Sequence, residues 1–534
     1  MPDQSHEPSS SSSLASAVST PPKQVDKGTL RKAISASALG NMTEWYDYGV
    51  YAATATYITA AFFPGDGLGK IGTMLGFAVS FLLRPLGGVV WGPLGDKLGR
   101  KAIMATTILL MAGATALIGA LPTHAMVGGL APVLLILLRV VQGFSTGGEY
   151  GGAATFMAEY SPDKKRGFFG SFLEFGTMCG FVLGSAVVLF LEVLLTDEQM
   201  SSWGWRIPFF VALPLGLVGW YLREQMHDSP VFNEMQNSDV VKENAWQRAL
   251  KYLRRDPKIL YVTIGSTALV AVAIAIAGLL VPGIRLGMSA PVFVAIVVAV
   301  AVAVMLLVGF NYALFYDYWR PILTMVAMVI ALNVANYTLL TYMPTYLKTT
   351  IGLAPSSATA LMLIGQLVMA MCIPLFGALS DRTGRKPLWI VSLLGMFLLA
   401  WPLYSLMGKG FGIAIVAFVI LGLLYIPQLA TISATFPAMF PTHVRFAGFA
   451  LSYNVATAAF GGTAPLVNEA VIESTGWNLF PAWYMMGACV IGLLAMPFLK
   501  ETARCSIRGT EIPGPHTDAT RLSEIEDARL AKAG

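Results

Sequence analysis

Two carboxylates in the first long apolar stretch are the residues best placed to do chemistry. Glu44 and Asp47 stand three positions apart in the segment 41–51, so on a helix they share one face. At 1.5 Å per residue, Glu44 lies about 16 Å from the start of the stretch, near the middle of a bilayer. A charge there costs at least about 2.5–3.5 kcal/mol on insertion scales. Two roles account for that cost: a structural ion pair with an arginine of a neighbouring helix, or a protonatable site, because desolvation favours the neutral carboxyl.

Other charged residues also fall inside apolar stretches. Arg84 and Arg139 are the basic residues that lie well inside such stretches, and each is expected to pair with a carboxylate. For Arg139, a structural salt bridge, a proton relay and a contact with a substrate anion all remain open. Glu149 stands among glycines that favour close helix packing, and Glu174 lies about two turns into a later stretch. The predicted proton-coupling residues are Glu44, Asp47, Arg139, Glu149 and Glu174.

The second half of the chain carries amides and aromatic residues in place of these charges. Asn333, Asn336 and Tyr337 fall on one helical face. Such a face suits a solute cavity, and it suits ordinary hydrogen bonds between helices equally well. The predicted substrate-binding residues from both halves are Trp45, Tyr48, Tyr51, Arg84, Gln142, Asn333, Asn336, Tyr337 and Tyr342.

Long uncharged stretches must position these residues. The chain is 55% hydrophobic and 12% charged, with a mean hydropathy of +0.65, whereas soluble domains carry roughly 25% charged residues. A bilayer-spanning helix needs about 20 apolar residues. The sequence therefore predicts an all-α membrane protein. Its spans are expected at about 33–62, 71–94, 102–121, 130–159, 167–194, 205–222, 259–282, 286–316, 321–347, 356–379, 387–407, 411–437, 446–472 and 479–499.

A charged loop occurs twice, at 95–101 and 380–386. A second pair of loops, at 162–166 and 441–445, has nearly the same offset, so both landmarks indicate an internal repeat. The aspartate of each first-named loop can accept hydrogen bonds from helix N-terminal amides or pair with a basic residue, and its glycine permits a tight turn. A purely topogenic positive cluster is the alternative. The predicted cytoplasmic-gate residues are Gly95, Asp96, Gly99, Arg100, Lys101, Asp381, Arg382, Gly384, Arg385 and Lys386.

The repeat divides the chain into two six-helix bundles with an insertion between them. Ranges 31–222 and 319–500 are the expected bundles. The remaining expected units are a disordered tail at 1–30, a polar loop at 223–258, a transmembrane hairpin at 259–318 and a tail at 501–534. The hairpin has no charge within its spans, which favours a lipid-facing appendage over a regulatory element.

The placement of charge predicts topology and excludes several function classes. Basic triplets such as Lys164, Lys165 and Arg166 occupy alternate loops, so the positive-inside rule predicts a multi-pass protein of the cytoplasmic membrane with both termini cytoplasmic. These residues flank spans, which argues against a nucleic-acid site. The four cysteines are scattered, and all five histidines lie in loops or tails. No metal and no cofactor is expected, and the absence of a GxxxxGK[ST] motif argues against an ATP-driven pump.

Several segments together resemble one family. The segments 41–51, 139–150, 158–163 and 205–210 are similar to motifs of the metabolite:proton symporter family within the major facilitator superfamily. Segments 339–347, 437–445 and 500–503 resemble its osmoregulatory proline/glycine betaine branch. The resemblance implies the major facilitator fold of two six-helix bundles, here with the two-helix insertion.

The resemblance and the residues together predict a secondary active transporter. Four acids within spans against two bases leave no surplus positive charge for a polyanion, so a zwitterionic compatible solute of the proline or glycine betaine type is expected, carried with protons by alternating access. The alternatives are a proton symporter of a carboxylic metabolite (a 2-oxo-dicarboxylate, citrate or shikimate-like) and, more distantly, a non-transporting membrane sensor. No nucleophile cluster indicates an enzyme. The expected partners are the solute, protons and the lipid bilayer, with no obligate protein partner evident.

Overall fold

The structure is a computed structural model. It describes residues 27–64, 69–87, 90–91, 100–147, 149–224, 261, 312–442, 444–507, 511–517 and 520. Most of the predicted loop 223–258, of the predicted hairpin 259–318 and of both predicted tails lies outside the described residues. So do Gly95, Asp96 and Gly99 of the first charged loop, and the side chains of Arg100, Lys101 and Glu149.

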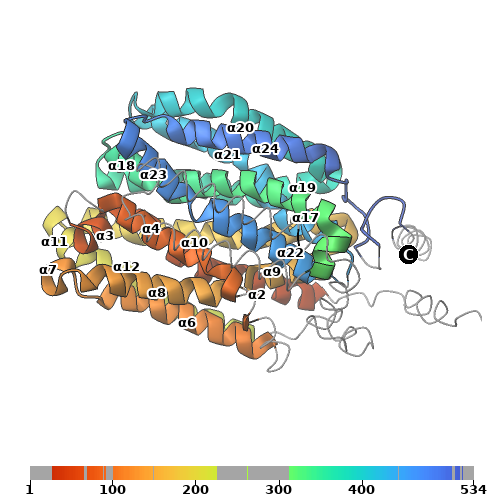
Figure 1. Ribbon diagram of the computed structural model, residues 1–534, viewed down its shortest axis with the longest axis horizontal. Coiled ribbons are helices and arrows are strands. Elements are labelled where there is room, and N and C mark those ends of the chain that lie inside the picture. The colour runs from red at the N-terminus through yellow and green to blue at the C-terminus, as the bar shows by residue number, and fades with distance from the viewer. Residues whose placement is uncertain are drawn as a thin grey trace, which may run out of the picture.

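The first half of the chain folds into helices that run between two ends of the molecule (Figure 1). They are α2 (Lys27–Ala53), α3 (Ala55–Phe62), α4 (Gly69–Leu82), α6 (Arg100–Ala120), α7 (His124–Val127), α8 (Leu130–Thr146), α9 (Glu149–Tyr160), η1 (Asp163–Lys165), α10 (Arg166–Leu194), α11 (Asp197–Ser202), η2 (Gly204–Arg206) and α12 (Ile207–Glu224).

The second half forms the layer drawn in green to blue in Figure 1. Its elements are α17 (Tyr312–Asn336), η5 (Tyr337–Tyr342), α18 (Met343–Thr349), α19 (Pro355–Thr383), α20 (Arg385–Met407), α21 (Phe411–Thr435), η6 (Pro437–Met439), α22 (Arg445–Ala456), η7 (Thr457–Gly461), α23 (Ala464–Thr475), α24 (Phe480–Ala495) and η8 (Met496–Phe498).

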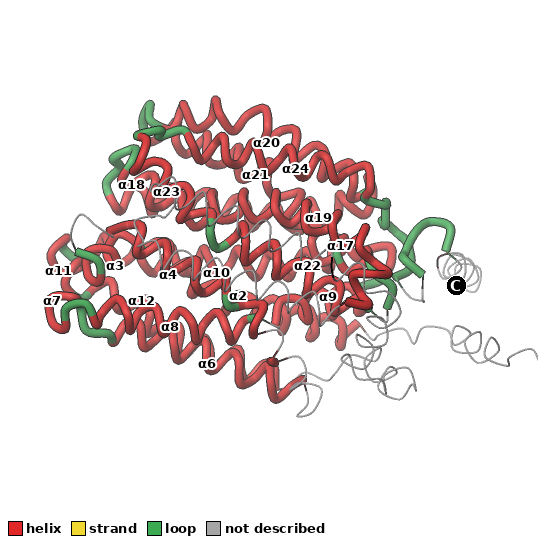
Figure 2. The backbone as a smooth tube through the Cα atoms, viewed as in Figure 1, coloured by secondary structure: helices red, strands yellow, loops and turns green. Residues whose placement is uncertain are grey.

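Every predicted span outside the hairpin coincides with a helix or with consecutive helices, as far as its residues are described. Figure 2 shows helix nearly throughout this part of the chain, with most of the loops at the two ends of the bundle. Eight of the described helices are long and apolar enough to cross a membrane, and 71–87 and 105–120 are shorter apolar helices. The first helix is absent from that set because it carries polar and charged residues among its apolar ones.

Several predicted spans are interrupted within the membrane-length stretch, among them 71–94 at Leu83 and 130–159 at Gly147. The first span breaks at Thr54, between α2 and α3. In the second half, η5 and η7 are wide π-helical turns, a geometry that is frequent at functional sites. The two wide turns lie close together, since a Cβ added at Gly461 of η7 would lie 2.6 Å from the ring of Tyr337 in η5. Asn333 of α17 also donates a hydrogen bond to Thr457 of η7 at 2.8 Å. Periodicity of apolar residues could not reveal these breaks because each side of a break is equally apolar.

Small residues let the backbone of α2 approach α10 closely. A Cβ added at Gly176 would lie 2.2 Å from the carbonyl oxygen of Ala38, and one at Gly180 would lie 2.6 Å from that of Met42. The stripe of small residues at every fourth position is the packing device expected between membrane helices. Asn41 fixes the same contact by donating to the Leu173 carbonyl at 2.8 Å. The helix that carries Glu44 and Asp47 is therefore held rigidly against α10.

The two halves meet along α10, which packs against α2 of its own half and against α19 of the other. Gly167 and Gly377 make the crossing close, because a Cβ at Gly377 would lie 2.7 Å from the Gly167 carbonyl oxygen. The end of the molecule where α2 begins and α24 ends is called the termini end below. The end that carries α3, α11 and α18 is called the α18 end (Figure 1).

Candidate functional site

The buried face of α2 gathers most of the charge in the first half. Glu44 and Asp47 are 2% and 1% exposed, and Tyr48 and Tyr51 are buried beside them. These residues follow one another at the three- and four-residue spacing of a helix face, as the sequence predicted. The arrangement places two carboxylates inside the bundle, each within reach of a different neighbouring helix.

Arg84, in the helical segment 84–87 just after the turn at Leu83 that ends α4, meets the first carboxylate. Its Nη2 lies 3.6 Å from Oε1 of Glu44 and donates to the Tyr48 hydroxyl at 2.7 Å. The guanidinium also lies over the ring of Phe81, 4.2 Å from the ring centroid. Arg84 is 2% exposed, so its charge is balanced inside the bundle by one carboxylate, a phenol and an aromatic face.

Arg139 of α8 meets the second carboxylate. Its Nη1 lies 3.3 Å from Oδ2 of Asp47, and its guanidinium carbon lies 3.5 Å from the centroid of the Tyr51 ring. Within the described residues, Nε and Nη2 of Arg139 have no hydrogen-bond partner although they are buried. Leaving buried charged donors without partners is costly, so this pair stabilises the fold less than a fully hydrogen-bonded pair would. Its role in proton coupling stays a prediction.

A small cavity lies next to the two carboxylates. Its volume is about 10 Å³, and its lining includes Thr43, Glu44, Asp47 and Thr115. That volume is close to the least that can hold one water molecule. Gln142, one turn after Arg139, donates to Thr115 at 2.7 Å and so faces α6 on this side of the bundle. The rest of the lining is apolar, from Ile108, Met111, Ala112 and Ala212, so the cavity next to the carboxylates is of mixed character.

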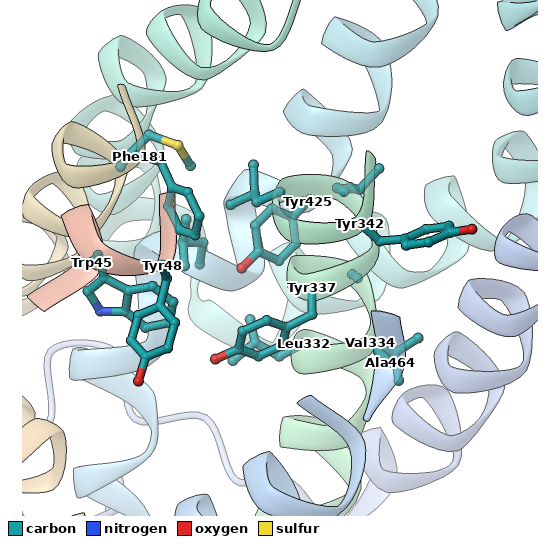
Figure 3. Packing of buried hydrophobic residues seen from close by; sticks show 14 of the residues in the cluster. Trp45, Tyr48, Phe181, Leu332, Val334, Tyr337, Tyr342, Tyr425 and Ala464 are labelled. Atoms are coloured by element: carbon teal, nitrogen blue, oxygen red, sulfur yellow. The ribbon is translucent and has the colours of Figure 1, made fainter. Parts of the chain in front are cut away.

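Aromatic rings join the two halves at the centre of the molecule. Trp45 stacks on Tyr337 of the second half with ring centroids 6.3 Å apart, and it contacts Tyr48 at 5.3 Å and Phe181 at 5.6 Å. Figure 3 shows Trp45, Tyr48 and Phe181 facing the helix that carries Tyr337. The ring of Phe81 completes the cluster, 5.0 Å from Tyr337.

Two polar atoms inside this aromatic cluster have no protein partner. The indole N–H of Trp45 and the hydroxyl of Tyr337 are buried and form no hydrogen bond within the described residues. Buried indole and phenol groups usually find a partner. The cluster therefore combines aromatic faces, two unused hydrogen-bonding groups and the nearby Arg84, at the boundary between the halves.

Glu174 of α10 belongs to a separate polar network. It accepts a short hydrogen bond from Tyr150 and another from Thr177 at 3.1 Å. Thr177 is bonded in turn to Asn41 of α2, and Tyr150 stacks on Tyr453 of the second half at 4.6 Å. Glu174 thus links α2 to the other half. The side chain of Glu149 lies outside the described residues, so its partner stays a prediction.

The predicted amide and aromatic face of the second half is divided among different partners. Asn333 donates to Thr457, Asn336 accepts from Tyr425 at 2.9 Å, and Tyr342 donates to Glu469 at 2.7 Å. Of these predicted residues, Tyr337 is the one shown stacking on the first half. Asn333 and Asn336 make the interhelical hydrogen bonds that were the alternative interpretation.

Glu469 is a buried carboxylate that sequence reasoning missed. The sequence analysis described amides and aromatic residues in the second half in place of buried charges, but Glu469 is 1% exposed inside α23. Its neighbour Asn468 is buried too and donates to Thr338 at 3.2 Å. Two adjacent polar residues in an apolar stretch were the available signal.

The second charged loop joins the two halves at the termini end. Asp381 accepts hydrogen bonds from the backbone N–H groups of Gly167 at 2.8 Å and Phe168 at 2.9 Å, at the start of α10. This is the helix N-terminal contact expected for the motif, made across the two halves. Gly384 has φ +95°, a conformation that suits glycine at the predicted tight turn. The gate role itself stays a prediction.

Further contacts at the same end include residues that the sequence analysis did not assign to a site. Arg445 of α22 pairs with Glu159 of α9 at 3.0 Å, again across the halves. Glu501 accepts from the backbone N–H groups of Arg385 and Lys386 and so caps α20, while Arg382 is exposed. Arg385 donates to the Thr502 carbonyl at 2.9 Å. Contacts of charged side chains and of backbone groups thus hold the two halves together at the termini end.

Comparison with known proteins defines the class of this molecule. A family model described as sugar (and other) transporter matches residues 32–258, and the Major Facilitator Superfamily model matches 326–529. The solved proton:xylose symporter of the same superfamily, bound to 6-bromo-6-deoxy-D-glucose, has the same fold, with a TM-score of 0.63 at 17% identity over 90% of this chain and 98% of its own. These matches confirm the predicted fold class and define a multi-pass membrane transporter.

Curated relatives narrow the class further. The chain is 38% identical to the glycine betaine/proline/ectoine/pipecolic acid transporter of Dickeya dadantii over 91% of this chain and 86% of the relative. It is 36% identical to the proline/betaine transporter of Salmonella typhimurium (92% and 90% covered) and 37% identical to the ectoine/proline transporter of Corynebacterium glutamicum (92% and 87%). The chain therefore belongs to the major facilitator superfamily and, within it, to the family of these transporters, which are not enzymes.

Proposed function

We propose that this protein is a proton-coupled symporter that takes up a small zwitterionic compatible solute of the proline or glycine betaine type by alternating access. The names of the relatives at 36–38% identity support the solute class. The basic residues at the termini end, Lys164, Lys165 and Arg382 among them, support a place in the cytoplasmic membrane with that end in the cytoplasm.

The observation that carries the proposal is the aromatic cluster around Trp45 and Tyr337. A methylated or secondary ammonium group gains roughly 0.5–2 kcal/mol over an aromatic face, more where water is excluded. The solute carboxylate would accept from the unused Trp45 indole N–H and from the hydroxyl of Tyr337. Because the two rings come from opposite halves, a solute between them contacts both rigid bodies and favours one arrangement of the halves over another.

Proton coupling would use the carboxylates of α2. Protonation of Asp47 removes its ion pair with Arg139, and protonation of Glu44 does the same for Arg84. Each event leaves a buried guanidinium without its counter-charge, so the helices that carry the two groups must rearrange or the solute carboxylate must take the place of the lost anion. Solute binding and proton binding then favour the same transition, which is the thermodynamic requirement for symport.

Uptake of labelled glycine betaine and proline tests the proposal. Cells that lack their own solute carriers would express the protein and receive an imposed acid-outside gradient. We expect accumulation of both solutes that collapses when a protonophore removes the gradient. Uptake of an oxo-acid, citrate or shikimate without competition from betaine or proline would assign the protein to the alternative class, the carboxylic-metabolite symporters.

A further inference from the structure

A buried ion pair at the α18 end joins the two halves, and nothing in the site described above uses it. Lys348 of α18 places Nζ 3.0 Å from Oε1 of Glu192 near the end of α10. The side chains are 5% and 2% exposed. Because Lys348 comes from the second half and Glu192 from the first, the pair can persist only while the halves are together at this end.

The other contacts of Lys348 also cross the boundary. Nζ donates to the carbonyl oxygen of Ala53 at 3.1 Å and lies 5.5 Å from the centroid of the Tyr57 ring. Ala53 is the last residue of α2, immediately before the break at Thr54, and Tyr57 belongs to α3. The hydroxyl of Tyr57 donates to Glu192 at 3.1 Å. Lys348 therefore binds the α2–α3 break and α10 at once.

The ion pair between Lys348 and Glu192 can open at a small cost in free energy. Burying two charges costs about as much as their attraction returns, so such a pair contributes little net stability compared with apolar packing. Within the described residues, Oε2 of Glu192 is buried without a hydrogen-bond partner, which leaves the carboxylate incompletely satisfied. A pair of this kind holds one arrangement while it is intact, and opening lets water solvate both charges.

The position of Lys348 connects it to the candidate solute site. Helix α18 follows directly from η5, the wide turn that begins with Tyr337. Tyr337 stacks on Trp45 of α2, and Lys348 binds the carbonyl at the end of the same α2. One continuous segment, 337–349, thus contacts α2 at the aromatic cluster and again at its end.

From these contacts we propose that Lys348 and Glu192, with Tyr57, form the gate at the α18 end, closed in this structure and broken once in each transport cycle. The proposal rests on the alternating-access cycle of the proposed function. Helix α10 is then held by the second half at both ends, by Asp381 at its N-terminal amides and by Lys348 near its C-terminus. A solute bound between Tyr337 and Trp45 would hold the segment 337–349 against α2. Because this segment includes α18, solute binding would favour the closed gate.

Thiol labelling of a buried reporter tests the gate without any solute. The four native cysteines, Cys179, Cys372, Cys489 and Cys505, would be replaced, and Thr345→Cys would serve as the reporter. Thr345 is 2% exposed and lies three positions before Lys348 on the same helical face. Right-side-out and inside-out membrane vesicles would receive a membrane-impermeant maleimide, so that opening is assigned to one membrane face.

We expect each single variant, Glu192→Gln or Lys348→Met, to raise the labelling rate of the Thr345→Cys reporter about tenfold from one membrane face only. A loss of about 1.4 kcal/mol in the free energy of gate closing changes the open population tenfold. Lys409→Met, which removes an exposed lysine from the α20–α21 loop, is the matched control and should stay at the parent rate. The exchange Lys348→Glu with Glu192→Lys should bring the rate back toward the parent.

A milder variant covers the case in which the charge variants fail to fold. Tyr57→Phe removes only the hydroxyl bonded to Glu192 and should raise labelling about threefold, the effect of losing one hydrogen bond. Parent-like labelling in folded Tyr57→Phe and in the folded charge variants would overturn the gate, as would equal increases from both faces. The labelling is measured without solute, so its result does not depend on which solute is carried. The uptake assay likewise does not depend on whether Lys348 and Glu192 form a gate.

Discussion

The two halves of the molecule bury different polar groups. The first half holds its centre with ion pairs, Glu44 with Arg84 and Asp47 with Arg139. The second half buries neutral hydrogen bonds, such as Asn333 to Thr457 and Tyr425 to Asn336, and the carboxylate of Glu469, which accepts from Tyr342. The sequence predicts one repeat pattern for both halves, so we attribute the difference to the side chains.

The difference separates two tasks. A buried ion pair responds to a single proton, because protonation of the carboxylate leaves an unmatched cation that the structure must accommodate. Amide and phenol side chains are uncharged over the physiological pH range. A network of them responds to the shape and hydrogen-bonding groups of a bound solute instead of to a proton. We therefore expect proton sensitivity in the first half and solute discrimination at the boundary, where Tyr337 meets Trp45.

The largest effect should come from the carboxylates of α2. Asp47→Asn keeps the shape of the side chain but removes the anion that faces Arg139, so solute accumulation against a gradient should fall by about 100-fold or more. Exchange of internal for external solute should persist in part, because exchange needs no net proton movement. Counterflow and net uptake in the same vesicles measure the two quantities.

Glu469→Gln is the matched variant in the second half. It removes a buried carboxylate that accepts from Tyr342, and Gln can still accept that hydrogen bond. We expect gradient-driven accumulation to fall by no more than about threefold. Equal losses in Asp47→Asn and Glu469→Gln would remove the distinction between the halves.

An intermediate effect is expected at the termini end. Asp381→Asn weakens two charge-assisted hydrogen bonds to the start of α10, worth roughly 1.5–3 kcal/mol to a charged group, and should slow turnover about tenfold. The equilibrium affinity for solute should change less than about twofold, since the aromatic cluster lies elsewhere on the chain. Paired binding and transport assays check this, with the exposed neighbour in Arg382→Gln as control. Loss of binding with intact turnover would show that Asp381 is not a latch.

The smallest effect separates a solute contact from a structural one. Tyr337→Phe removes a hydroxyl without a protein partner, so Tm should not change while KM for solute rises about fivefold, the value of about one hydrogen bond. Tyr425→Phe removes the bond to Asn336 and should lower the free energy of unfolding by about 1 kcal/mol with little change in KM. The reverse pattern would place the solute nearer to Tyr425.

Sequence reasoning reached the helices and the unusual charges but not their partners. Hydropathy located the spans, and the cost of a buried charge singled out Glu44, Asp47, Arg84 and Arg139. Which arginine meets which carboxylate depends on how neighbouring helices are rotated, and a single sequence does not encode that directly. Asp381 was predicted to accept helix N-terminal amides because the motif itself carries that chemistry.

The parts that the sequence analysis missed all depend on contacts between distant segments. In the sequence, Lys348 and Glu192 are ordinary charged residues near the ends of spans. Their proposed role as a gate follows from the contact that they make across the two halves. Glu469 was overlooked because proximity to a span end normally implies solvent, whereas packing buries it. The π turns at η5 and η7 were invisible because the apolar pattern continues through them.

Proton movement driven by solute tests the central claim most directly. The purified protein would be reconstituted into liposomes that contain a pH-sensitive dye and no imposed gradient, and glycine betaine or proline would then be added outside. The account predicts that either solute acidifies the lumen of wild-type liposomes and that Asp47→Asn abolishes this signal while solute exchange continues. Solute entry without any change in lumenal pH, or an undiminished signal in Asp47→Asn, would contradict it.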